Sequence, residues 1–244
     1  MNARITFATA GRVLSQLRHD HRTLALMIVV PCVLISLLAW VFEGTQTFDR
    51  VGAPLLGVFP FVVMFLVTSV ATLRERTSGT LERLLTMPIG KLDLLVGYAL
   101  AFGLVAVVQA VVATTLAVTA LGLDVAGPLW LLMVVAVLDA VLGMALGLLV
   151  SAFAATEFQA VQFMPAFVLP QFLLCGLLVP RADLDTALRW VSDALPLSYA
   201  VDAMRDIVAR EDVGSGAWAD LSVVLFAIVL SLALGAVTLR RRTG

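Results

Sequence analysis

The sequence predicts an all-α membrane protein with six transmembrane helices, and three observations support this prediction. Of the 244 residues, 61% are hydrophobic and 14% are charged, whereas soluble domains carry about 25% charged residues. The mean hydropathy is +1.04. Apolar runs of about twenty residues recur, long enough to cross the hydrocarbon core of a bilayer. Because these runs are apolar on every face, they fit helices and not the alternating strands of a barrel.

The six expected spans form one membrane domain that covers residues 1–244. The first apolar run has no small-residue cleavage pattern after it, so we expect it to be retained as a span and not removed as a signal peptide. By length and lack of charge, the spans lie at about 24–42, 54–73, 94–121, 129–153, 158–179 and 221–239.

The distribution of basic residues predicts that both termini are cytoplasmic. Eleven of the 16 Arg and Lys residues lie on the side of the N-terminal segment, the loop between spans two and three, and the C-terminal tail. Cytoplasmic loops carry such an excess, so 181–220 is the large external loop. Fifteen arginines against a single lysine are typical of a GC-rich genome. We therefore expect a multi-pass protein of a bacterial plasma membrane.

Segment 4–22, before the first span, shows the pattern of an amphipathic helix lying in the membrane interface. Phe7, Ala10, Leu14 and Leu17 share one helical face, with arginines largely opposite. The alternative is a disordered basic tail that only sets the topology.

The external segment predicts a helical hairpin between spans five and six. Leu184, Leu188, Val191 and Leu195 keep helical spacing, and Pro196 is well placed to begin a second short helix.

The charged segment 74–93 between spans two and three predicts a short cytoplasmic helix. Gly79 can cap a helix whose first turn holds Glu82, favourable near the positive helix end. Pro88 ends that helix. Leu81, Leu84 and Leu85 then share one face. Mixed charge around a small apolar face is typical of a docking surface. The alternative is that the basic residues only fix the topology.

Two polar residues lie inside the predicted spans, Gln109 in span three and Asp139 in span four. Ionisable groups in the hydrocarbon core are costly and should face protein or a wet cavity. The two residues sit at similar depth, so they can form a hydrogen-bonded clasp between helices, or Asp139 can line a transport path. Gly143 and Gly147 form a G-x-x-x-G pattern that favours close helix packing.

Three motifs in order resemble ATP-binding-cassette type-2 permease subunits, closest to the daunorubicin-resistance-like permeases. "RERTSGTLERLLTMPI" is similar to the cytoplasmic loop of that family, and departs from it at Thr77-Ser78 and Met87. "QFMPAFVLPQFLLCGLLVP" resembles its fifth span, and "LPLSYAVDAMR" its external segment. The matching positions in these last two motifs are Pro165, Pro170, Gln171, Gly176, Pro180, Pro196, Leu197, Tyr199 and Arg205.

The resemblance implies that the charged loop is a coupling helix docked on a separate ATPase subunit. Two ATPase copies would carry ATP and Mg²⁺, and would drive this permease paired with a second copy or a sister permease. Substrates would be hydrophobic or amphipathic drugs, antibiotics or lipids moved outward. The implied ATPase contacts are Glu75, Arg76, Gly79, Thr80, Leu81, Glu82, Leu84 and Leu85.

The chain itself carries no pattern of an ATPase or other enzyme. Its one Gly-Lys pair, Gly90-Lys91, lacks the glycine and the Ser/Thr of a P-loop. We expect no catalytic residue, no cofactor of its own, no metal site, and, with a net charge of -1, no nucleic-acid binding. Cys32 and Cys175 lie in apolar runs and suit packing.

Two rival functions remain at this point. One is an ATP-independent channel or proton-coupled carrier that uses Asp139, although a carrier should show an internal repeat and broken helices. The other, an intramembrane enzyme, lacks paired catalytic residues.

Overall fold

The computed structural model describes residues 2–43, 47–77 and 90–238, and this part of the chain is helical without a strand. In chain order the helices are α1 (Ala3–His19), α2 (His21–Val41), α3 (Thr47–Thr77), α5 (Lys91–Thr119), α6 (Leu129–Ser151), α7 (Glu157–Leu174), the 3₁₀ turn η1 (Arg181–Asp183), α8 (Thr186–Ala194), α9 (Pro196–Ala209) and α10 (Ser215–Thr238).

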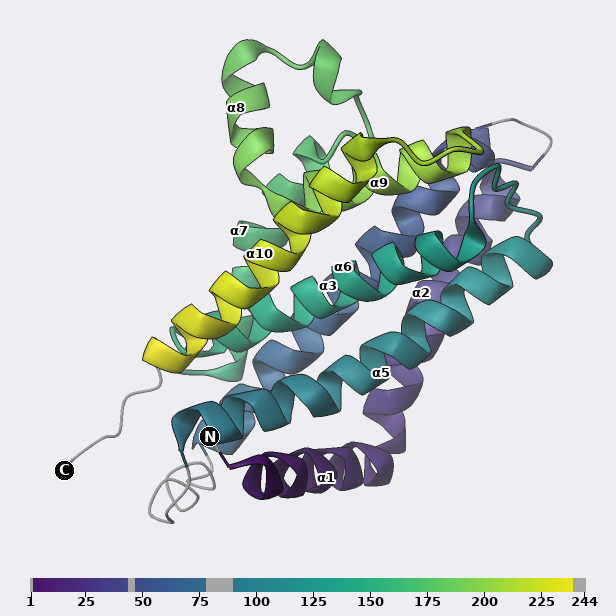
Figure 1. Cartoon of the computed structure of the whole chain (residues 1–244). Coiled ribbons are helices and arrows are strands. Elements are labelled where there is room, and N and C mark those ends of the chain that lie inside the picture. The colour runs from purple at the N-terminus through teal and green to yellow at the C-terminus, as the bar shows by residue number, and fades with distance from the viewer. Residues whose placement is uncertain (1, 44–46, 78–89, 239–244) are drawn as a thin grey trace.

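The long helices run side by side as a bundle built around α3 and α6 (Figure 1). α3 and α6 make the most extensive contact, and α5, α9 and α10 each pack against α6. α1 lies across one end of the bundle, where α5 begins and α10 ends, and α8 stands at the opposite end (Figure 1).

The seam between α3 and α6 depends on glycine. A Cβ on Gly143 would lie 2.2 Å from the carbonyl oxygen of Phe61, and one on Gly147 would lie 2.5 Å from that of Phe65. Glycine lets helix backbones approach this closely. The seam confirms the close packing that the G-x-x-x-G pattern predicts. Because residue numbers rise together along both partners, the two helices are parallel.

Five helices in the described chain are long and apolar enough to cross a membrane: α2, α3, α5, α6 and α10. The fifth predicted span, 158–179, overlaps α7, which has 18 residues, two internal prolines and a C-terminal end at Leu174. At about 1.5 Å per residue α7 is roughly 27 Å long, slightly less than the roughly 30 Å hydrocarbon core. Five of the six predicted spans therefore coincide with helices long and apolar enough to cross a membrane, and the fifth, 158–179, stays a prediction.

Helix α1 forms where the amphipathic segment was predicted, but its buried face is rotated. Val13, Ala10 and Leu17 are buried as α1 packs on α5. Phe7, expected on the same apolar face as Ala10, is 67% exposed. Threonines take part in the buried face, because α1 packs against protein there and not only against lipid.

The segment between α7 and α10 contains two helices that differ in burial. α8 buries only Ser192, whereas half of the residues of α9 are buried, and α9 packs against α3, α6 and α10. Pro196 is the first residue of α9, as its spacing predicted. The loop before α6 packs on the C-terminal end of α9. The backbone amides of Ala126 and Gly127 donate hydrogen bonds to the carbonyl oxygens of Val208 and Ile207 in α9.

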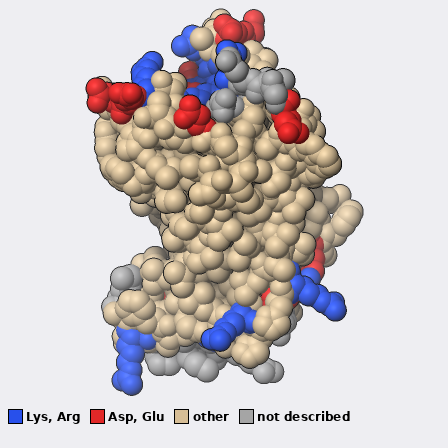
Figure 2. Space-filling model, turned by 90° about the vertical axis from the view of Figure 1, so that its right-hand side faces the viewer, with Lys and Arg blue, Asp and Glu red and all other residues tan. Residues whose placement is uncertain are grey.

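Charged side chains gather at the two ends of the molecule. On the face shown in Figure 2, a broad belt between the ends carries neither acidic nor basic residues. Many large apolar side chains are exposed on α2, α5, α7 and α10. The belt fits a bilayer core, in which exposed apolar side chains face lipid. The orientation of the bundle in the membrane stays a prediction from the distribution of basic residues.

The predicted topology can be tested with single cysteines. A cysteine replacing the exposed Ser215, which begins α10, should react with a membrane-impermeant maleimide in intact cells. A cysteine replacing the exposed Ser15 on α1 should react only after the cells are opened. The parent chain, with Cys32 and the buried Cys175, gives the background. The reverse pattern of labelling would contradict the orientation.

Candidate functional site

The candidate site is built where α3 ends, because the charged segment starts there. Arg12 of α1 binds Glu75 through two hydrogen bonds, 3.0 Å from Nη1 to Oε1 and 3.2 Å from Nη2 to Oε2. The same guanidinium donates to the hydroxyl of Tyr98 on α5 at 3.0 Å. The side chains of Arg12 and Glu75 are 29% and 15% exposed. A bidentate pair of this kind holds geometry firmly, so α1, α3 and α5 meet at one point.

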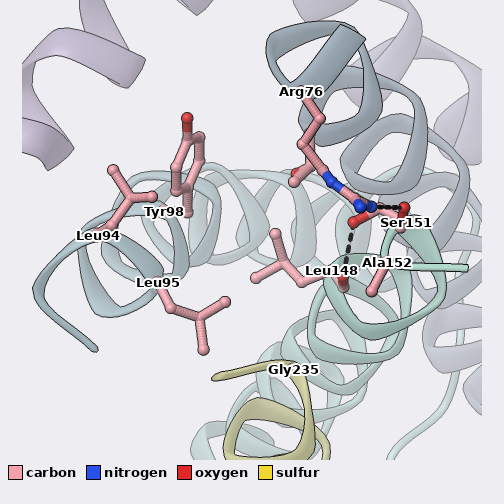
Figure 3. Close-up of a pocket in the computed structure, with 9 residues that line it drawn as sticks. Arg76, Leu94, Leu95, Tyr98, Leu148, Ser151, Ala152 and Gly235 are labelled. Atoms are coloured by element: carbon pink, nitrogen blue, oxygen red, sulfur yellow. Dashed lines mark hydrogen bonds between the residues drawn. The ribbon is translucent and has the colours of Figure 1, made fainter. Parts of the chain in front are cut away.

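Arg76 leaves α3 on another side and reaches α6. Its guanidinium donates to the carbonyl oxygen of Ser151, while the Ser151 hydroxyl donates to the carbonyl of Leu148 (Figure 3). These groups border a cavity of about 20 Å³ whose other walls are mostly apolar, with Thr72 and Tyr98 among them. The cavity is too small for a substrate, because it holds little more than one water-sized sphere. Arg76 therefore ties the end of α3 to the end of α6.

A second carboxylate binds α1 on the far side of the charged segment. Asp93, in the first turn of α5, accepts hydrogen bonds from the Asn2 amide at 2.8 Å and the Thr6 hydroxyl at 3.4 Å. The segment 78–89 is thus bracketed by two acidic residues that both hold α1. The predicted contact residues Gly79, Thr80, Leu81, Glu82, Leu84 and Leu85 lie outside the described residues.

Beside this junction, a cavity of about 400 Å³ opens between α1, α2, α3 and α5. Leu17, Leu26, Val67 and Phe102 are among the apolar side chains that form its deeper wall. Its polar lining comes from the ends of α1 and α3 and the start of α2, with Gln16, Asp20, Thr23, Arg74 and Glu75. The volume falls in the range of roughly 300–1,000 Å³ typical of small-molecule sites.

The ionised groups at this polar end have defined partners. Arg74 pairs with Glu157 of α7, with 2.8 Å between Nε and Oε1. Asp20 is the N-cap of α2, where it accepts hydrogen bonds from the hydroxyl and amide of Thr23. These bonds, the hydroxyl first, lower the pKa of Asp20 despite some desolvation, and Arg74 adds to the effect. Asp20 is therefore ionised at neutral pH.

The predicted clasp between Gln109 and Asp139 is wrong. The Gln109 amide donates to the carbonyl oxygen of Met27 on α2 at 2.6 Å. Both carboxylate oxygens of Asp139 are buried without a hydrogen-bond partner among the described residues, and Oδ2 lies over Gly57 of α3. Gln109 therefore faces α2, whereas Asp139 faces α3, and sequence spacing between two helices cannot show such a difference in direction.

A double-mutant cycle tests this correction. Gln109→Leu should cost about 1 kcal/mol, the usual net value of a hydrogen bond. Asp139→Asn should change stability by less than about 1 kcal/mol, because the substitution removes no hydrogen bond. The combined variant should equal the sum within about 0.5 kcal/mol, as for sites without shared partners. Thermal unfolding of the four purified proteins measures these differences, and a coupling well beyond that margin would restore the clasp.

At the other end of the bundle, the motif residues of the fifth span and the predicted external segment come together. Gln171 bridges α7 and α9: its amide donates to the Phe167 carbonyl at 3.1 Å, and its oxygen accepts from the Leu197 amide at 3.4 Å. Gly176 turns the chain after α7 with φ +92, a conformation that favours glycine. Pro165 and Pro170 lie inside α7.

Arg181, which sequence reasoning missed, is the centre of a network at this end. It forms ion pairs with Asp193 of α8 and Asp202 of α9, and its guanidinium lies 5.0 Å from the ring centroid of Tyr199. The Tyr199 hydroxyl donates to the Asp193 carbonyl at 2.7 Å. The network fixes α8 against α9.

Two more motif residues border the same network. Pro180 precedes the 3₁₀ turn that carries Arg181. Arg205, one further motif residue, donates to the Leu177 carbonyl at 3.5 Å. The two motifs thus meet through Gln171 with Leu197 and Gly176 with Arg205, and none of their matching positions lines the 400 Å³ cavity.

Much of the contact geometry at the two ends of the bundle depends on Arg12, Asp93 and Arg181. The sequence gives only a weak signal for each of them. Asp93 and Glu75 flank the charged segment symmetrically, which could have suggested a common partner. Arg12 and Arg181 looked like topology-setting charges, because a single sequence does not show which acid meets which base.

Comparisons with known proteins agree with this architecture. The sequence profile of the ABC-2 type transporter family matches residues 5–209. The chain is 27% identical over 188 residues to ABC transporter G family member 20 of Dictyostelium discoideum, which covers 77% of this chain and 25% of that protein.

Two proteins of Escherichia coli K12 are also similar to this chain. The probable multidrug ABC transporter permease YbhR is 27% identical over 157 residues, 64% of this chain and 43% of YbhR. The probable multidrug ABC transporter permease YbhS is 25% identical over 147 residues, 60% of this chain and 39% of YbhS. The chain therefore aligns with less than half the length of each of these relatives. The family profile matches most of the chain, and the structure is a bundle of long apolar helices. The chain therefore belongs to the ABC-2 type transporter family.

Proposed function

We propose that this chain is the permease subunit of an ATP-driven exporter and that a separate ATPase subunit binds the charged segment after α3. The observation that carries the proposal is the junction at the end of α3. Glu75, Arg76 and Asp93 fasten both sides of segment 78–89 to α1 and α6. A force applied to that segment therefore reaches α1 and α6, and it reaches α5 through the hydrogen bond from Arg12 to Tyr98.

Besides the predicted ATPase contact, Glu75 provides a route by which movement of the ATPase can reach α1. The carboxylate of Glu75 is already held by Arg12, so any contact that it makes with a motor is shared with α1. Movement of the motor would tilt α1 together with α3 and α5. Interactions that change between two states are what couples a binding event to a conformational change.

The transport path is proposed to form between two permeases, either two copies or this chain and a sister subunit. Exposed apolar side chains on α2 and α7 fit this arrangement, and only 17% of the membrane-spanning window of α2 is buried in the single chain. The proposed substrates are hydrophobic or amphipathic compounds, and ATP and Mg²⁺ belong to the partner subunits.

The structure offers little to the carrier alternative. Asp139, its key residue, is fully buried against Gly57 and Met204 rather than exposed to a cavity. A proton-coupled carrier would need Asp139 to reach water from each side in turn. The exporter proposal requires no such access.

Copurification followed by transport tests the proposal. The chain is co-expressed with candidate ABC ATPase subunits of its source organism, purified through a tag on the permease, and reconstituted in vesicles. We expect two ATPases and two permeases per complex, and export of a fluorescent amphipathic dye that requires ATP. A well-folded permease that binds no ATPase and moves the dye without ATP would contradict the proposal.

A further inference from the structure

We propose that the 400 Å³ cavity between α1, α2, α3 and α5 binds a cationic amphiphile, with its apolar part against the deeper wall and its positive group beside Asp20. The inference rests on the proposed function and deepens it, because it names a ligand class and a place for it on a single permease chain. The shape and the charges of the cavity support it independently.

The cavity is amphipathic along its length. Leu26 on α2 lies one turn deeper than Thr23, and Val67 and Val70 on α3 lie one to two turns deeper than Arg74. Phe102 of α5 adds an aromatic wall, and Val161 of α7 borders the same space. A molecule with one apolar and one polar end therefore fits in a single orientation.

The charges at the polar end favour a cation over an anion. Glu75 is neutralised by Arg12, and Arg74 is shared between its ion pair with Glu157 and the nearby Asp20. Among the described lining residues and their ion-pair partners, the carboxylates of Asp20, Glu75 and Glu157 face the guanidinium groups of Arg12 and Arg74. Asp20 forms no ion pair of its own within the described chain, so one negative charge is left to attract a positive group.

The position of the cavity also fits uptake from the inner side of the membrane. Its polar end lies near α1, which lies across one end of the bundle (Figure 1), and its apolar lining comes from α1, α2, α3, α5 and α7. A cationic amphiphile in the inner leaflet has its charge at this level. Because α1 forms one wall through Val13 and Leu17, movement of α1 would change the shape of the cavity.

Two ions of the same shape and opposite charge make a direct test. The purified chain is kept in an uncharged maltoside detergent, which has no lipid head groups that could bind the ions. It is then titrated with tetraphenylphosphonium and with tetraphenylborate by isothermal calorimetry. We expect saturable binding of the phosphonium ion and at least tenfold weaker binding of the borate. Equal affinities would overturn the assignment of the ligand class.

Asp20→Asn and a distant control isolate the charge. Asparagine is as good an N-cap as aspartate, so α2 keeps its start. The phosphonium Kd should rise about two- to fivefold, the effect of one exposed charge pair, and borate binding should not weaken. Asp124→Asn, at an exposed acidic residue before α6, should change neither phosphonium binding nor borate binding. An unchanged phosphonium Kd in Asp20→Asn would overturn the role of this residue.

Cavity-filling variants locate the binding site. Val67→Phe and, separately, Ala71→Leu place bulk inside the cavity, and each should weaken phosphonium binding at least tenfold. Val111→Phe, on the exposed side of α5, is the matched control. Gel filtration and thermal unfolding show which variants are folded. Folded variants of both kinds that bind like the parent would refute the site.

The outcomes separate this inference from the proposed function. The titrations use the permease without ATPase or ATP, so binding at the cavity stands even where ATP-driven export fails. Conversely, ATP-driven export with no phosphonium binding at this cavity would refute the site and leave the exporter proposal intact.

Discussion

Replacing Gly143 with valine is expected to force α3 and α6 apart and to destabilise the bundle strongly. The new Cβ would lie 2.2 Å from the carbonyl oxygen and 2.9 Å from the Cα of Phe61. These are backbone atoms of α3, so no side-chain rotation relieves the overlap and the two helices must separate. Overpacking typically costs about 1–3 kcal/mol, and a rigid backbone contact should bring the cost to about 3 kcal/mol or more.

The seam extends beyond one residue, so the loss should spread along it. Gly147 meets the Phe65 carbonyl, and Thr68 donates to the Met144 carbonyl at 3.3 Å between the same two helices. Separation at Gly143 weakens these neighbouring contacts. A drop in the unfolding temperature of roughly 6–12 °C follows for a chain of this size, together with lower yield of folded protein.

Gly103→Val is the matched control for this prediction. Gly103 lies on α5, another membrane-spanning helix, and a Cβ there meets nothing within 4 Å. The control carries the same change in helix propensity and hydrophobicity, and should shift the unfolding temperature by no more than about 2 °C. Equal shifts in the two variants would show that valine itself, rather than the seam, causes the loss.

The second large effect is expected at the ion pair between Arg12 and Glu75. Arg12→Ala leaves a largely buried carboxylate without its bidentate partner, which costs about 1–3 kcal/mol locally. It should release α1 from α3 without preventing insertion, because the spans are unchanged. ATP-driven dye export in vesicles should fall at least tenfold, while ATPase copurification persists.

This result distinguishes two roles for Glu75. If Glu75 only touches the ATPase, Glu75→Ala should impair export and Arg12→Ala should not. If movement passes from segment 78–89 through Glu75 to α1, both variants should impair export alike. The charge-swapped double variant, Arg12→Glu with Glu75→Arg, should then recover a substantial part of the activity.

A matched control keeps the prediction specific to the pair. Arg18 is an exposed arginine on α1 for which the described chain shows no ion pair. Arg18→Ala makes the same change in charge and should leave export within about twofold of the parent. Normal export by Arg12→Ala, in a well-expressed complex, would show that α1 has no part in the coupling.

Much of the fold followed from hydrophobicity along the chain. Lipid cannot hydrogen-bond to the backbone, so long apolar runs must be helices, and five of the six predicted spans are helices of the expected kind. Pro196 and the pair Gly143 and Gly147 were also interpreted correctly, because each acts through backbone geometry that the residue type itself dictates.

The sequence was less informative for α7. Its glutamines and two prolines lower its apolar character, so by length and composition the fifth predicted span, 158–179, stays a prediction. The end of the predicted span was also too late, because the chain leaves the helix at Leu174 and turns at Gly176.

By itself, then, the sequence determined the class of protein, the number of long apolar helices to within one, and the places where helices begin or come close. Those properties depend on single residues and on local runs. Only the tertiary structure decided which side of each helix meets a neighbour. Gln109 turns to Met27 instead of Asp139, Arg12 selects Glu75, and Arg181 selects two acids. Rotation about a helix axis is fixed by the summed packing of every element around it. Apart from a small-residue pattern such as Gly143 and Gly147, an apolar helix carries little in its sequence that marks this direction.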